Sequence, residues 1–375
     1  MKKRKRLIKI TGVLIAVAFV INTGMVGVPR DVEAHGNEST GLFSDVSDAT
    51  DDTAEEWSYS EIFNKNDFQN LQLKDQYALI DVPNEYIIDV SDEKLIMYVV
   101  NFPYLVDAFA YDNPKQGVNH VCKICSALAE LLKKDNAETL IYDALNNLQK
   151  YISEDNVQGE YAASVAETFL RTLIEVKFDS QEKSAFTETR SLVSVTRKFA
   201  GTNGTFYNTT YYNSGTYTLN GVSVNCNNYS SGDLTSTQKQ QVNTAFENTH
   251  SSWTRLQSAS TKYNCHSYAF YSTASGNSYW ISNPSAIYNS LYYLVGSGVV
   301  NPHVGDKAVL RGSYVYDEFG VYHNAIHSAN VISAGYSPTA IQTESKLGAL
   351  GTYRTSLSNL ISMYGSTSYD IYRWN

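Results

Sequence analysis

The stretch Tyr263-Asn264-Cys265-His266-Ser267-Tyr268-Ala269 decides how the second half of this 375-residue chain is interpreted. Cys265, Tyr268 and Ala269 recur at helical intervals, which predicts a helix that starts near Asn264. A cysteine at a helix start lies near the positive end of the helix dipole and near unpaired backbone N–H groups, and both lower the pKa of a thiol. The same N–H groups can stabilise the oxyanion of a tetrahedral intermediate. Cys265 is therefore the candidate nucleophile.

A histidine and a carboxylate follow Cys265 in an informative order. His327 comes 62 positions later in a predicted strand over Ile326–Ser333, and Glu344 ends a predicted strand over Ala340–Glu344. A turn at Gly335–Pro338 can bring the two strands into register. A cysteine hydrolase needs a thiol, a base and a polar group that orients the base, and these three residues supply them. For Glu344, an exposed edge-strand charge or a partner for Lys346 is the alternative.

Three other polar residues are assigned structural roles. His266 is on the wrong helical face if Cys265 points into a cleft, so we expect a surface or structural histidine. His323 and His327 are four apart, as two zinc ligands on a helix would be, but the glutamate of the His-Glu-x-x-His motif is missing. Asp306 follows Gly305 and is expected to be a turn or capping carboxylate. We therefore expect no metal and no cofactor.

The chain has only four cysteines, too few for a disulfide scaffold. Cys122 and Cys125 share a predicted helical stripe over Val118–Leu132, which favours buried core thiols over a redox or metal pair. A bridge between Cys226 and Cys265 is a further alternative, and it would block the nucleophile.

The first 56 residues are typical of an exported protein. Basic residues, an apolar run and a small residue at Ala34 predict a signal peptide over residues 1–34, with an uncleaved membrane anchor as the alternative. Residues 35–56 are acidic and poor in apolar groups, which predicts a disordered leader. We expect a secreted or cell-wall-associated protein that contacts the membrane only through the signal segment.

The remaining chain divides into two predicted domains, with a linker around residues 180–197. Residues 57–190 show apolar residues every three or four positions, including a helix that follows Ser91 and stops at Pro103, and predict a small helical domain. Residues 191–375 hold 20 of the 29 tyrosines and predict an antiparallel sheet, with a helix over Thr235–Trp253, a strand over Ala308–Leu310 and a hairpin that turns at Asn213–Gly215. The predicted fold class is α+β.

Charge differs sharply between these halves. Residues 35–190 carry 12 basic and 29 acidic side chains, a balance of −17, and residues 191–375 carry 10 and 7, a balance of +3. Opposite signs favour docking of one half on the other, and the basic half tolerates an anionic surface such as a Gram-positive wall. Two solvated surfaces are the alternative. We expect no nucleic-acid partner.

Residues 255–350 resemble the CHAP and NlpC/P60 amidohydrolases of the papain-like superfamily. The resemblance rests on Cys-x-x-Tyr-Ala at Cys265, Val-Gly-Asp-x-Ala-Val at Val304, His-x-Ala-x-Val at His327 and Thr-Glu-Ser at Thr343. It implies a papain-like domain with a helix packed on an antiparallel sheet, in which Cys265 is the nucleophile, His327 the base and Glu344 the orienting acid. The chain departs from the pattern at His266-Ser267, where the CHAP group often has Thr-Trp, and in the Ser-Lys-Leu-Gly run after Glu344.

The expected function is that of an exported cysteine amidohydrolase or endopeptidase that cleaves amide bonds through a thioester at Cys265. Peptidoglycan stem or cross-bridge peptides are the expected substrate. The alternatives are a non-catalytic wall- or glycan-binding protein and an acyl-transferring enzyme that forms amides. The helical half is expected to be an accessory domain, as a propeptide over the cleft, a wall-directed module or a protein-binding platform.

Overall fold

The computed structural model describes residues 57–65, 67–178, 211–298, 301–317 and 319–375. The predicted signal peptide, the predicted leader and the predicted linker at 180–197 lie outside these residues. Within the described residues, no helix combines the length and the apolar character needed to cross a membrane.

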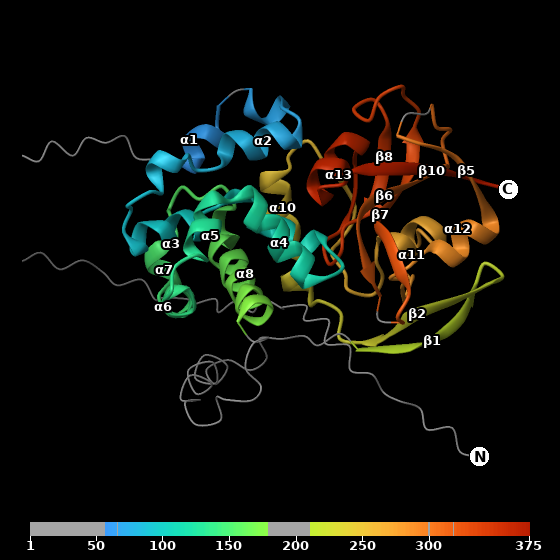
Figure 1. Ribbon diagram of the computed structural model, residues 1–375, viewed down its shortest axis with the longest axis horizontal. Helices are drawn as coiled ribbons and strands as arrows, with labels where there is room; N and C mark the ends of the chain where they lie inside the picture. Colours follow the sequence, from blue (N-terminus) through green and yellow to red (C-terminus); the bar gives the residue numbers. More distant parts are fainter. Residues whose placement is uncertain (1–56, 66, 179–210, 299–300, 318) are drawn as a thin grey trace, which may run out of the picture.

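Helices form the described part of residues 57–178 (Figure 1). The α-helices are α1 (Tyr59–Phe63), α2 (Leu73–Ile80), α3 (Asp92–Val100), α4 (Pro114–Ile124), α5 (Ser126–Leu131), α6 (Ala137–Asn146), α7 (Leu148–Tyr151) and α8 (Ala162–Lys177). The 3-10 helices are η1 (Phe68–Asn70), η2 (Asn84–Tyr86), η3 (Pro103–Ala110) and η4 (Gly159–Tyr161). The helix expected after Ser91 is α3, and the Ser91 side chain accepts from the backbone N–H of Lys94 as an N-cap.

One predicted helix is split in two. The stretch Val118–Leu132 is interrupted at Cys125, whose backbone is extended with φ −129° and ψ 95°. The Asp81 carboxylate accepts hydrogen bonds from the backbone N–H of Ser126 at 2.7 Å and from its hydroxyl. A distant side chain thus caps the new start of α5, and such a tertiary contact leaves no local signal in the sequence.

Residues 211–375 are dominated by antiparallel strands. The strands are β1 (Tyr211–Leu219), β2 (Val222–Ser231), β3 (Thr254–Gln257), β4 (Tyr279–Trp280), β5 (Tyr292–Ser297), β6 (Lys307–Tyr316), β7 (Tyr322–Ser333), β8 (Gln342–Lys346), β9 (Thr352–Ser356) and β10 (Ser368–Trp374). A seven-stranded sheet has the order β3-β9-β8-β7-β6-β10-β5, and a smaller sheet has the order β1-β2-β4. The helices of this half are α10 (Ser236–Thr249), α11 (Cys265–Phe270), α12 (Ser285–Leu291) and α13 (Leu357–Tyr364). The predicted α+β class is confirmed.

The predicted hairpin turn at Asn213–Gly215 is wrong. Strand β1 runs straight through it and pairs with β2, from Gly215 opposite Cys226 to Leu219 opposite Val222. The chain turns instead at Asn220 and Gly221, whose φ values are +51° and +82°. Asn-Gly is the dipeptide that a two-residue hairpin turn with positive φ favours.

Other predicted elements agree with the structure in kind and differ in extent. Helix α10 starts after Thr235, which forms a capping box with Gln238, but it ends at Thr249, before Trp253. Strands β6, β7 and β8 contain or overlap the stretches predicted around residues 308–310, 326–333 and 340–344.

The large sheet is covered on both faces. Leu310 and Ile371 pack in one core cluster with Leu357 and Leu360 of α13, whereas Val309 packs in a second cluster with Phe270 of α11. Helices α11 and α13 therefore lie on opposite faces. Because Cys265 begins α11, the face that each side chain of β7 and β8 occupies determines whether it can lie near Cys265.

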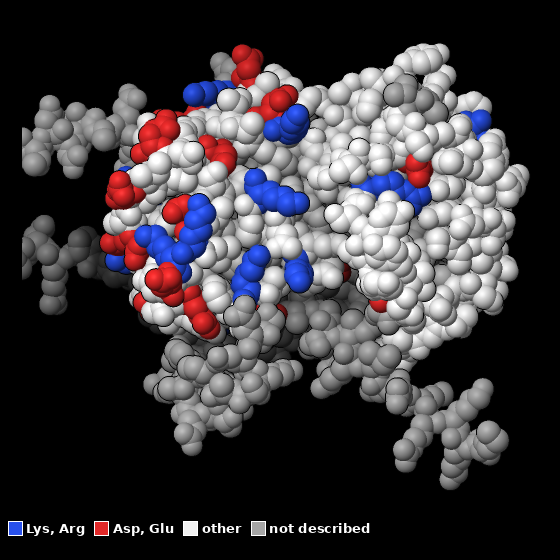
Figure 2. Space-filling model, viewed as in Figure 1, with Lys and Arg blue, Asp and Glu red and all other residues white. Residues whose placement is uncertain are grey.

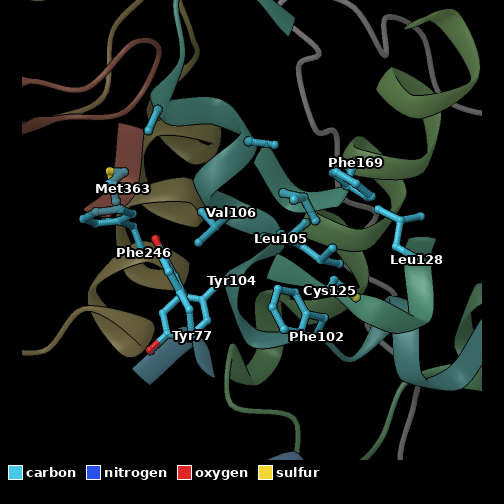
Figure 3. Packing of buried hydrophobic residues seen from close by; sticks show 14 of the residues in the cluster. Tyr77, Phe102, Tyr104, Leu105, Val106, Cys125, Leu128, Phe169, Phe246 and Met363 are labelled. Atoms are coloured by element: carbon cyan, nitrogen blue, oxygen red, sulfur yellow. The ribbon is translucent and has the colours of Figure 1, made fainter. Parts of the chain in front are cut away.

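The two segments predicted as separate domains share one hydrophobic core. Figure 3 shows Val106 of η3 beside Phe246 of α10 and Met363 of α13, and these residues belong to the same buried cluster. Charge remains divided between the halves, because the face in Figure 2 carries most of its charged side chains over the helices and few over the sheet. The helical half is thus packed against the α13 face of the sheet.

Candidate functional site

Helix α11 starts at Cys265, as predicted, because Asn264 caps it. The Asn264 Oδ1 accepts from the backbone N–H groups of Ser267 and Ile281, each at 3.2 Å. Its Nδ2 donates to the carbonyl of Ile281 at 2.8 Å and to Oδ2 of Asp112 at 2.6 Å. All four contacts fix the residue before the candidate nucleophile, and one of them comes from the helical half.

The Cys265 thiol is buried and polar groups surround it. The side chain is 1% exposed, and Sγ lies 3.8 Å from Oδ2 of Asp112. Burial, followed by the Asp112 carboxylate, raises the pKa of the thiol well above its usual value, although the N–H groups of Ser328 and His266 act in the opposite direction. The lowering expected from the helix start is therefore outweighed, and the resting group is a neutral thiol.

His327 is held by a different residue from the one predicted. Its Nε2 is hydrogen-bonded to the Ser345 hydroxyl, and its ring stacks on Tyr364 of α13, with centroids 3.9 Å apart. Burial, and then the nearby His266, lower the pKa of His327 well below its usual value. Within the described residues no hydrogen bond joins this ring to Sγ of Cys265, so the predicted contact between nucleophile and base is not formed.

The start of α11 nevertheless contacts β7 at Ser328, the residue after His327. Ser328 follows His327, its backbone N–H lowers the pKa of the Cys265 thiol, and its hydroxyl lies 2.8 Å from Nδ1 of His266. A register shift in β7 explains the arrangement: Leu310 opposes His327 and Arg311 opposes Ala325, which leaves Ile326 as the extra residue of a β-bulge. Past the bulge Ser328 faces α11, and His327 faces α13.

The assignment of Glu344 as the orienting acid is wrong. Glu344 opposes Asn330 in the antiparallel pair, so its side chain lies on the α11 face with Ser328. Its Oε1 accepts from Arg354 at 2.7 Å. The alternating side chains of a strand place the next residue, Ser345, on the His327 face.

The alternative partner for Glu344, Lys346, is also engaged elsewhere. Lys346 is fully buried, and its ammonium group donates to the carbonyls of Ser260, Gly348 and Leu350. Burial lowers its pKa to about 7.

Asp112 was missed by the sequence analysis. Ligand-type atoms of Asp112, Cys265 and His266 all lie within 4.8 Å of one another. The carboxylate comes from the loop between η3 and α4, which the chain separates from Cys265 by 153 positions. Only the packing of the two halves brings it near the thiol.

The other three polar residues considered from the sequence are His266, His323 and Asp306. His266 is buried rather than on the surface, and burial lowers its pKa to about 3. His323 and His327 both lie on strand β7 rather than on a helix, so their spacing is not that of two zinc ligands on one helical face. Asp306 is a turn carboxylate as predicted, because it accepts the backbone N–H of His303, and it also pairs with Arg373.

All four cysteines are free thiols, so no bridge joins Cys226 to Cys265. Cys125 is buried and Cys122 is partly buried. Burial raises the pKa of both of these thiols.

A pocket of about 330 Å³ lies beside this cluster. Asp112 and His266 contribute to its wall, together with residues from both halves of the chain. The cluster of Asp112, Cys265 and His266 therefore combines a carboxylate, a thiol and an imidazole beside a cavity, which is an arrangement suited to acyl chemistry. The chain matches no protein-family model, no curated protein and no solved structure.

Proposed function

We propose that the protein is a cysteine amidohydrolase or endopeptidase of the papain-like, NlpC/P60 type, with Cys265 as nucleophile and His327 as base. One observation carries the proposal: Nδ1 of His266, the residue that follows Cys265, lies 2.8 Å from the hydroxyl of Ser328, the residue that follows His327. This contact joins the start of α11 to β7 next to His327, and it supports the proposed pairing of Cys265 with His327. Ser345 takes the orienting role in place of Glu344.

The hydrogen bonds of Ser345 define the tautomer of His327. The Ser345 hydroxyl donates to the carbonyl of Ser328 at 2.9 Å, so its oxygen accepts the hydrogen on Nε2 of His327. A neutral imidazole carries one N–H, and Nδ1 is therefore the basic nitrogen. This is the role that a third polar group has in a catalytic triad.

The proposed reaction starts from two neutral groups. Sγ of Cys265 attacks the amide carbon while Nδ1 of His327 takes the thiol proton. Because the ring of His327 stacks on Tyr364 on the α13 face, this step requires β7 to rearrange at the Ile326 bulge when substrate binds, so that the ring reaches the sulfur. His327 then gives that proton to the leaving amine, and a thioester remains on Cys265. Water attacks the thioester with His327 as base, which releases the acid and restores the thiol.

Peptidoglycan stem or cross-bridge peptides are the proposed substrate. This part rests on the predicted export segment and on the family resemblance of residues 255–350. The test compares Cys265→Ala with Cys226→Ala, which changes a buried cysteine outside the cluster that forms no disulfide, on purified cell walls and on a stem-peptide library. Cys265→Ala should reduce hydrolysis by at least about a thousandfold with an unchanged circular-dichroism spectrum. Full activity in that variant contradicts the proposal.

A glycan-binding protein without catalysis is the second candidate, and one observation favours it. Tyr314, Tyr316 and Tyr322 are exposed at one end of the β6–β7 pair. The ring of Tyr322 stacks on Tyr314 with centroids 4.9 Å apart and lies tilted against Tyr316 with centroids 4.8 Å apart. Exposed aromatic rings can stack on sugars. Wall binding that is lost in Tyr316→Ala, with no hydrolysis by the parent protein, would support this candidate. Slow alkylation of Cys265 does not separate the two, because the resting thiol is neutral in both.

A further inference from the structure

The pocket beside Cys265 is shared by the two halves of the protein. Asp112 comes from the helical half, and Tyr212, Trp280 and Asp317 come from the sheet half. The rings of Tyr212 and Trp280 meet edge to face with centroids 6.0 Å apart. The wall therefore combines aromatic surface with two carboxylates.

The carboxylates are the permanently ionised side chains of the wall, which also holds the two imidazoles of His266 and His323. Asp112 and Asp317 belong to it, and no lysine or arginine is among the described residues that line it. The buried His266 stays neutral at pH 7, because burial lowers its pKa to about 3. A cavity with carboxylates and aromatic faces attracts a cation, since both interact favourably with positive charge.

We infer that this pocket binds an aliphatic primary ammonium group on the substrate of Cys265. The inference rests on the proposed function and specifies its substrate class. Asp112 is the anchoring residue, because its Oδ2 is 3.8 Å from Sγ of Cys265. An ammonium group held there is close to the amide carbon that the sulfur attacks. The methylene groups that carry the ammonium contact the rings of Tyr212 and Trp280.

The binding test uses the full chain with Cys265→Ser, so that no turnover occurs. Two peptides are titrated by calorimetry at pH 7: one contains a lysine with a free ammonium group, and the other contains Nε-acetyl-lysine. The free ammonium should bind about tenfold more tightly. Asp112→Asn should remove most of that preference, and Asp317→Asn should reduce it. Glu85→Gln, an exposed charge outside the pocket wall, controls for the general loss of negative charge.

Each outcome decides the inference. Equal affinity for the two peptides overturns it, and so does a preference that persists when Asp112 and Asp317 are both replaced in a folded protein. A preference that only the pocket variants abolish supports it. A failure of this inference can be distinguished from a failure of the proposed function. Peptide binding is measured in the Cys265→Ser protein, which has no nucleophile, whereas hydrolysis of unmodified walls is tested with Cys265→Ala.

Discussion

Asp112 and Cys265 belong to opposite halves of the protein, yet Oδ2 of the first lies 3.8 Å from Sγ of the second. The carboxylate also accepts from Asn264, which caps the helix that Cys265 begins. It therefore holds the helix start in place and at the same time disfavours a thiolate there. The helical half is in this way part of the candidate site as well as a neighbour of it.

Replacing Asp112 with Asn should make Cys265 more reactive. The substitution keeps the shape of the side chain and removes a negative charge that raises the thiol pKa. At pH 8, iodoacetamide should alkylate Cys265 about three to ten times faster in Asp112→Asn than in the parent protein. Mass spectrometry of the peptide that contains Cys265 measures the rate. Glu85→Gln should leave the rate unchanged. An unaltered rate in Asp112→Asn would show that the carboxylate has no electrostatic effect on the sulfur.

Neighbouring residues of β8 should differ in their effect on catalysis. Ser345→Ala removes the acceptor that fixes the tautomer of His327, and we expect a loss of about tenfold to a hundredfold in kcat/KM. Glu344→Gln removes only a partly exposed ion pair with Arg354, and its effect should stay within about twofold. Steady-state kinetics on a peptide substrate measure both. The opposite order of the two variants would restore Glu344 as the orienting residue.

Local patterns in the sequence predicted the helix start at Cys265, the capped start of α3 and the strands that carry His327 and Glu344. Each depends on neighbours in the chain: Asn264 caps α11, and apolar residues set the strand faces. What the patterns missed depends on contacts across the chain. A bulge at Ile326 turns β7, the β7–β8 register puts Glu344 on the α11 face, and Asp112 arrives from the other half.

The domain organisation also depends on contacts between distant segments, which local sequence patterns do not predict. Composition and charge change between the halves as the sequence indicates, but an apolar stripe does not reveal its partner. The stripes of the helices pack on the α13 face of the sheet, so residues 57–178 and 211–375 share a core. The Cys125 break between α4 and α5 also comes from a distant residue, Asp81.

Stability should fall as the solution becomes acidic, and His120 should contribute. Burial lowers the pKa of His120 to about 4 in the folded protein, against about 6.5 when unfolded. Between these values the unfolded chain binds more protons, so the free energy of unfolding falls as pH drops below 6.5. From pH 7.5 to 5.5 this residue accounts for about 1.4 kcal/mol.

Urea unfolding of His120→Gln at the two pH values isolates this contribution. The drop in the free energy of unfolding should be smaller than in the parent by about 1.4 kcal/mol. Replacing the exposed His303 with Gln should leave the drop unchanged. If the free energy of unfolding falls by the same amount in the parent, His120→Gln and His303→Gln, the pKa of His120 is not lowered in the folded state.

Gly348 should be the least replaceable glycine where the two halves meet. Its φ is +42°, and a Cβ would lie 2.6 Å from the carbonyl carbon of Ala110, a backbone atom that cannot move aside without shifting η3. Gly365 has a φ of +56° with open space around it, so Gly365→Ala measures the backbone strain alone, about 1–2 kcal/mol. Gly348→Ala should cost at least about 2 kcal/mol more, because the clash adds to the strain. Urea unfolding at pH 7.5 compares them, and similar losses would show that η3 and the Gly348 loop are not packed as tightly as the structure places them.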